Sequence, residues 1–238
     1  CVLQCRQSVT TGYHPDMEKF QRIYERAVKR KGEEQLQAWL PKARTDLGLK
    51  RLAGSTYLSE MSRAVFRSGF VWRFVDYKWP TMTEALYDFD PVACAFQPDE
   101  AIESLMVDER VIRHLKKLRS VRENAAFVLE MERTHKSFGK YLADWPVDDF
   151  VGLHADLKKR GTRLGGRTGQ FFLRRVGKDT FCLTRDVVGA LIRQKVVDKN
   201  PTAKRDLAAV QAAFHEWREQ SGRPLCEISR VRSCSIEG

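Results

Sequence analysis

A basic, glycine-rich turn is the part of the sequence best suited to bind an anion. Residues 157–173 read LKKRGTRLGGRTGQFFL. Gly161, Gly165 and Gly166 allow positive φ angles and let another backbone approach closely. The first N–H groups of the helix expected after this turn have no partner inside that helix, so they can bind a phosphate. A helix end followed by a solvated basic turn explains the local pattern equally well.

The same turn resembles a helix-hairpin-helix motif, in which a Gly-hydrophobe-Gly turn is followed two residues later by Thr and a small residue. Leu164-Gly165 and Thr168-Gly169 fit that pattern, whereas Arg163 stands where the first glycine would be. With this motif we expect a set of hairpin residues to contact DNA: Lys158, Arg160, Gly161, Arg163, Gly165, Gly166, Arg167 and Thr168.

The overall charge also favours a polyanionic partner. The 238 residues include 42 Lys and Arg against 31 Asp and Glu, a formal net charge of +11. Lys and Arg side chains that neutralise phosphates release condensed counterions, which favours binding. Since 42% of the residues are apolar, the chain can also bury a sizeable core.

Neither a membrane span nor a secretion signal is expected. No apolar run reaches the roughly 18–20 residues that cross a bilayer, and residues 1–11 lack the apolar stretch of a signal peptide. We therefore expect a cytoplasmic protein without membrane contact and with reduced cysteines. The six cysteines include no CxxC pair and no compact group of four, which argues against zinc fingers and iron–sulfur clusters.

The apolar residues repeat with a helical period almost everywhere, so we predict an all-α fold. The expected helices cover residues 20–31, 58–75, a short segment from 91, 108–133, 136–143, 148–159, 166–176, 184–194 and 204–220. Trp79-Pro80 is expected to stop the second of them, and Asp90-Pro91 to supply the N-cap and first residue of the short one. We expect residues 1–50 to form an N-terminal helical arm that packs on a main domain, 51–238. A single domain over 1–238 is the alternative.

Three blocks in the same order resemble the DNA-3-methyladenine glycosylase I family. They are Ser68-Gly69-Phe70-Val71-Trp72 with Phe89-Asp90-Pro91, then Val111-Ile112-Arg113-His114 with Lys117-Leu118 and Asn124-Ala125, then Leu157-Lys158-Lys159-Arg160-Gly161 with Arg185-Asp186-Val187-Val188-Gly189. The resemblance implies the helix-hairpin-helix DNA glycosylase fold, with two helical lobes around a cleft that receives a flipped nucleotide.

The resemblance also implies roles for individual residues. Trp72 would stack on the extruded base, with Tyr57 as a second base contact, because aromatic faces bind bases in this way. Arg67 and Phe70 occupy the loop with which the family probes the stack and fills the gap. Without the resemblance, an ordinary core tryptophan is the favoured interpretation of Trp72.

Several positions depart from the family pattern. The base-recognising glutamate of the family corresponds to Ala64, and Glu60, one turn earlier, could substitute. The superfamily's catalytic aspartate position holds Thr184, and Asp186 lies two residues later. We therefore take Glu60 and Asp186 as the candidate catalytic residues. An alkylated purine is cationic and already a good leaving group, so shape and desolvation matter more than a strong acid.

The family's zinc site is not expected here. The positions that match its later His and Cys hold Asp186 and Ala190. Tyr13-His14 and the upstream Cys1 and Cys5 echo only the N-terminal half. We predict no metal and no cofactor; a regrouped site with Cys226 or Cys234 is the alternative. His114 is expected to be structural or to face a phosphate.

The preferred functional hypothesis is a monofunctional DNA glycosylase of base-excision repair. It would act as a monomer on double-stranded DNA with a damaged base and hydrolyse the N-glycosidic bond of alkylated purines such as 3-methyladenine. Strand cleavage is not expected, because the Schiff-base lysine position of bifunctional enzymes falls near Arg167, which stays protonated. The alternatives are a non-catalytic protein that binds DNA damage or DNA structure, and a helical protein-interaction domain.

Overall fold

The computed structural model describes residues 17–236, and every regular element in that range is helical. The elements are α1 (Phe20–Lys31), α2 (Glu33–Trp39), α3 (Asp46–Lys50), α4 (Gly54–Arg67), α5 (Trp72–Ala85), η1 (Tyr87–Phe89), α6 (Pro91–Ala95), α7 (Asp99–Ser104), α8 (Leu115–His135), α9 (Phe138–Ala143), α10 (Phe150–Arg160), α11 (Arg167–Val176), α12 (Arg185–Arg193), α13 (Lys204–Ser221) and α14 (Leu225–Cys234). The prediction of an all-α fold is confirmed. The residues Cys1, Cys5, Tyr13 and His14 lie outside the described range.

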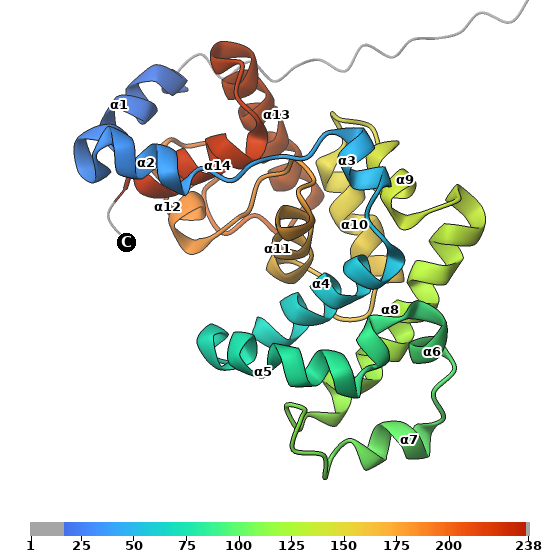
Figure 1. Ribbon diagram of the computed structural model, residues 1–238. Coiled ribbons are helices and arrows are strands. Elements are labelled where there is room, and N and C mark those ends of the chain that lie inside the picture. Colours follow the sequence, from blue (N-terminus) through green and yellow to red (C-terminus); the bar gives the residue numbers. More distant parts are fainter. Residues whose placement is uncertain (1–16, 237–238) are drawn as a thin grey trace, which may run out of the picture.

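Two hydrophobic cores divide the helices into two lobes. The first core is built from α4 to α9 together with α11, and the second from α1, α2, α12, α13 and α14. Figure 1 shows these two groups on either side of α10 and α11. Helix α10 joins them, because Phe150 at its start packs in the second core while Leu153 and Leu157 pack in the first.

The N-terminal helices are part of the second lobe. Phe20, Ile23 and Ala27 are the buried face of α1, which packs against α13 and α14. Gly32 ends the helix at a φ of 78°, as its position after the apolar stripe predicts. The chain then crosses to the first lobe, where α3 packs on α9 (Figure 1). Residues 17–50 therefore contribute to both lobes.

The helix predicted over 58–75 is in fact two helices. Helix α4 ends at Arg67, Gly69 takes a φ of +92°, and α5 begins at Trp72. Only glycine adopts such an angle without strain, so the chain turns here. Pro80, expected to stop the helix, lies inside α5. The prediction of Asp90 as the N-cap of a short helix is confirmed, since its carboxylate accepts from the Ala93 N–H at 2.7 Å.

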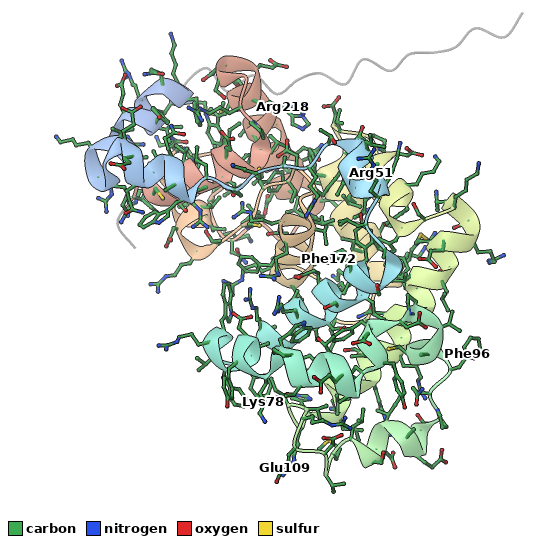
Figure 2. All side chains as sticks on the ribbon, viewed as in Figure 1. Arg51, Lys78, Phe96, Glu109, Phe172 and Arg218 are labelled. Carbon is green, nitrogen blue, oxygen red and sulfur yellow. The ribbon has the colours of Figure 1, made fainter. Side chains whose placement is uncertain are left out.

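The long helix predicted over 108–133 begins later, at Leu115. Val111 and Ile112 are buried, but they lie in the irregular segment that precedes the helix. Side chains of α4, α9 and α11 fill the centre of this lobe, including Phe172, which Figure 2 labels in the interior. Within residues 17–236, no helix is both long enough and apolar enough to cross a membrane.

Candidate nucleic-acid interface and base site

The glycine-rich turn forms a surface hairpin between α10 and α11. Arg163 adopts a φ of 62° and Gly166 a φ of 57° with ψ −135°, so the chain reverses twice. Leu164 is the buried anchor, at 1% exposure. A Cβ at Gly169 would lie 2.3 Å from the carbonyl oxygen of Leu164, so only glycine fits there. Arg163 therefore differs from the glycine of the motif in residue type but still adopts a left-handed φ.

Asn124 of α8 holds this hairpin in place with two hydrogen bonds. Its side-chain oxygen accepts from the Thr162 N–H at 2.8 Å, and its side-chain nitrogen donates to the Thr162 carbonyl at 3.1 Å. Asn124 is fully buried, so these two bonds satisfy an amide that would otherwise be costly to bury. Sequence reasoning quoted Asn124 only as part of a family block and did not predict this contact.

The hairpin cations differ in their partners. Arg160 donates to Glu130 at 2.8 Å and to Asp156 at 3.1 Å, so its charge is compensated within the protein. Arg163 and Arg167 are exposed. The stem of Lys158 lies against Gly165, where a Cβ would meet the Lys158 Cγ at 3.2 Å. The exposed hairpin therefore presents free N–H groups at the start of α11 together with uncompensated positive charge.

A pocket separates the hairpin from the loop that follows α4. It has a volume of about 290 Å³ and is lined by Val65, Ser68, Lys117, Arg163 and Gly165. Phe70 belongs to the loop on the other side. Its ring is half-buried, 4.5 Å from the Lys117 ammonium and 6.1 Å from the His114 ring. His114 is the N-cap residue of α8 and packs on Phe70.

Trp72 stands at the first position of α5 with 49% of its surface exposed. Its indole N–H donates to the Arg67 carbonyl at 3.1 Å, and its ring meets Phe171 edge to face at 5.4 Å. The Arg67 guanidinium lies 5.1 Å from the ring centroid. These contacts fix the orientation of Trp72 and leave half of the indole open to solvent. Neither of the two described pockets is lined by Trp72.

Arg67 and Glu60 belong to an ion-pair network between α4, α5 and α11. Arg67 contacts both carboxylate oxygens of Asp76 at 2.5 Å, and this holds the pKa of Asp76 below its usual value. Glu60 is bound by Arg175 through both of its oxygens, and Arg63 lies 3.6 Å away. In this conformation Arg67 positions Trp72 and does not extend toward solvent, and Glu60 is held by two guanidinium groups.

The remaining predicted site residues lie elsewhere. Tyr57 is completely buried and donates to the Leu49 carbonyl at 2.8 Å, so it cannot stack on a base in this conformation. Thr184 is the N-cap of α12, where its hydroxyl accepts from the Val187 N–H at 3.3 Å. Asp186 is half-exposed in the first turn of that helix. The structure brings Arg67, Phe70 and Trp72 together with the hairpin in the first lobe, and places Asp186 on a helix of the second lobe.

The described cysteines are buried and free. Cys226 donates to the Pro41 carbonyl, and its pKa is raised to about 12 by burial and by the nearby Asp179. In residues 17–236 no three His, Cys, Asp or Glu side chains are grouped so that they could hold a metal ion.

Residues 55–159 match the model of the methyladenine glycosylase family. Over this segment the chain is similar to that family. The resemblance inferred from the sequence is thereby confirmed, and the methyladenine glycosylase segment contains α4 to α10 with Phe70, Trp72, Lys117 and Asn124. No curated protein sequence matches the chain.

Solved structures of helical DNA glycosylases are similar to this one. The 3-methyladenine DNA glycosylase I of Staphylococcus aureus is 23% identical over 60% of this chain and 83% of its own, with a TM-score of 0.49. The 8-oxoguanine DNA glycosylase of Methanocaldococcus jannaschii is 14% identical over 88% of this chain and 89% of its own, with a TM-score of 0.54. Its complex with a 15mer DNA gives a TM-score of 0.51 at 13% identity. The Methanocaldococcus likeness extends over both lobes and confirms the predicted fold.

Proposed function

We propose that this chain is a monofunctional DNA glycosylase that removes alkylated purines, 3-methyladenine among them, from double-stranded DNA. The observation that supports this most directly is the position of the hairpin. It follows the methyladenine glycosylase segment without a break, and Asn124 of that segment holds it at the surface. A phosphate bound there would lie beside the pocket that separates the hairpin from the Phe70 loop.

In the proposed reaction the hairpin binds the DNA backbone, Phe70 fills the gap in the duplex and Trp72 stacks on the extruded base. A water oxygen forms a bond to C1′ while the bond from C1′ to the purine nitrogen breaks. The electron pair neutralises the cationic base, and the water proton passes to solvent or to a carboxylate. Because the leaving group is cationic, this step needs little acid catalysis. Asp186 remains a predicted proton acceptor, and Glu60 is assigned to the ion-pair network.

Strand cleavage is not part of the proposal. The position that matches the Schiff-base lysine falls near Arg167, whose guanidinium stays protonated and is no nucleophile. Borohydride treatment of the protein with abasic DNA is therefore expected to give no covalent adduct. An adduct on any lysine would contradict the monofunctional assignment. The protein is also expected to sediment as a monomer, alone and on a short duplex.

Release of free 3-methyladenine from methylated duplex DNA, followed by chromatography, tests the proposal. Trp72→Ala is expected to slow release at least about tenfold, because stacking on one aromatic contributes about 1–3 kcal/mol. Trp39→Ala is the matched control, since Trp39 of α2 is exposed to a similar extent, 45%, and lies in the other lobe. Binding to undamaged duplex should be unchanged in both variants. Equal loss in both variants would contradict the role of Trp72.

One observation favours a second candidate, a non-catalytic protein that binds damaged DNA. Ala64 replaces the family's base-recognising glutamate, and Glu60, the nearest carboxylate along α4, is bound by Arg175 and Arg63. Tight, salt-sensitive binding to a duplex with an abasic analogue, without release of any methylated base, would support this candidate and overturn the enzymatic one.

A further inference from the structure

Lys117 is buried beneath the loop that connects α4 to α5. Its side chain comes from α8 and is only 4% exposed. The ammonium donates to the carbonyl oxygens of Phe66, at 3.2 Å, and of Ser68. Both carbonyls lie at the C-terminal end of α4, where helix carbonyls have no partner inside the helix and carry partial negative charge. Lys117, a residue of α8, thus satisfies carbonyl groups at the C-terminal end of α4.

The same ammonium also holds Phe70. It lies 4.5 Å from the centroid of the Phe70 ring and 5.8 Å from that of Phe66, within the range of cation–π attraction. The His114 ring contacts Phe70 from a second side, edge to face. Gly69, which precedes Phe70, adopts its positive φ without strain because it has no Cβ. The shape of the loop therefore depends on contacts from α8.

We infer that Lys117 is a positioning residue, whose charge holds residues 66–70 in the shape in which Phe70 enters the gap left by an extruded nucleotide. This inference rests on the proposed function, because it assigns Phe70 to the gap. Lys117 touches neither the base nor the reacting bond. It acts on the loop backbone and on the Phe70 ring.

The charge of Lys117 depends on its surroundings. Burial lowers the pKa of the ammonium to about 8, with a smaller contribution from the positive charge of Arg163 across the pocket. The other charged groups around the loop are the Arg67–Asp76 ion pair on α4 and α5, and His114 at the start of α8. Among these groups, Lys117 is the one whose pKa burial brings to about 8, so its charge is expected to change as the pH rises through that value.

As the pH rises through the pKa of Lys117, insertion of Phe70 should weaken, whereas the contribution of Lys117 to the free energy of unfolding should increase. The loop contacts need the protonated form, so they are complete below about pH 8 and weaken as pH rises through that value. Because the folded pKa lies below the unfolded one, the unfolded state binds more protons in this range. The contribution of Lys117 to the free energy of unfolding therefore rises with pH. A purely structural role would make both readouts move together.

The experiment uses a duplex that contains an uncleavable abasic analogue with 2-aminopurine next to the gap, whose fluorescence reports insertion of a side chain. At saturating protein and pH 7.5, Lys117→Met is expected to lower the fluorescence change at least about threefold. Its Kd for undamaged duplex should change less than about twofold. Lys116→Met is the matched control, because Lys116 is the exposed neighbour on α8 and the substitution removes the same charge. It should leave the fluorescence change as in the wild type.

The wild-type pH profile provides a test that does not depend on the variant folding. The fluorescence change should fall as the pH rises above about 8, where Lys117 loses its proton, whereas that of Lys117→Met should be flat. A pH-independent wild type, or a Lys117→Met protein with the full fluorescence change, would overturn the inference. No bond is cleaved in this assay, so absence of base release would count against the proposed enzyme and not against Lys117.

Discussion

Arginine side chains gather in two regions of the first lobe, the hairpin at residues 160–168 and the corner where α4 and α5 meet α11. In the corner, Arg63, Arg67 and Arg175 are all paired with Glu60 or Asp76. In the hairpin, the described contacts include an ion pair for Arg160 and none for Arg163 or Arg167. The same residue type therefore has different partners in the two regions.

This difference separates arginines that are available to bind DNA from arginines that position neighbouring side chains. A guanidinium already bonded to a carboxylate in a partly buried network has few free N–H donors for a phosphate. Its pairing also restricts neighbouring side chains. Arg67 acts in this way on Trp72, through its backbone carbonyl and through the face of the ring. An exposed, unpaired arginine beside free helix N–H groups is available to DNA.

The largest effect is expected from a change in the hairpin backbone. In Gly169→Ala the new methyl group would lie 2.3 Å from the Leu164 carbonyl oxygen, so the two backbone segments must separate. DNA affinity should fall at least about thirtyfold in a duplex-binding titration, because the N–H groups at the start of α11 lose their arrangement.

Gly165→Ala is the control for that change. Its methyl group would meet only the flexible stem of Lys158, at 3.2 Å, and φ at Gly165 is not positive. Affinity should change less than about threefold. Equal loss in the two variants would mean that the hairpin needs small residues in general and not a close backbone contact at Gly169.

A smaller effect is expected from breaking the corner with Glu60→Gln. Arg175 and Arg63 then lose their shared anion in a partly buried site, where side-chain exposure is 18% for Glu60 and 28% for Arg175. The free energy of unfolding should fall by about 1.5–3 kcal/mol, the range for a hydrogen bond to a charged group. Urea denaturation measures this change.

The same variant decides between two roles for Glu60. If it positions the loop and Trp72, base release should follow the loss of stability and recover at lower temperature. If it positions water, as its sequence position suggested, release would be lost while stability is nearly unchanged. The second result would move Glu60 from the ion-pair network to the catalytic residues.

The hairpin was predictable from sequence because its determinants are local. Glycines at 165, 166 and 169 and a buried Leu164 act within a few residues of one another, and helical periodicity gives α10 and α11 on either side. Local reasoning also identified the start of α6 at Asp90. The break in the 58–75 segment was missed because Pro80 was weighed above Gly69, although the positive φ at Gly69 decides where the chain turns.

The corner was not predictable in the same way. Glu60 and Arg175 are 115 residues apart, and no local pattern indicates that they pair. Tyr57 matched an aromatic base contact by type, but its burial depends on Phe138 and Phe172 from distant helices. Lys117 contacts the loop and Asn124 contacts the hairpin only because α8 packs against both. Long-range packing, which a single sequence does not display, sets these roles.

The smallest effects are expected among the hairpin cations, and they test the comparison most finely. Arg163→Ala should weaken duplex binding about threefold to tenfold and lower the salt slope by about one ion, since an unpaired charge that contacts a phosphate is lost. Arg160→Ala should change affinity less than about twofold, because Glu130 and Asp156 already compensate that charge. Glu130→Gln removes one of these partners and should strengthen binding slightly at low salt, with little loss of stability at this exposed pair. If Arg160→Ala instead weakens binding as much as Arg163→Ala, the Arg160 ion pairs must open when DNA binds, and pairing in the free protein would not distinguish binding arginines from positioning ones.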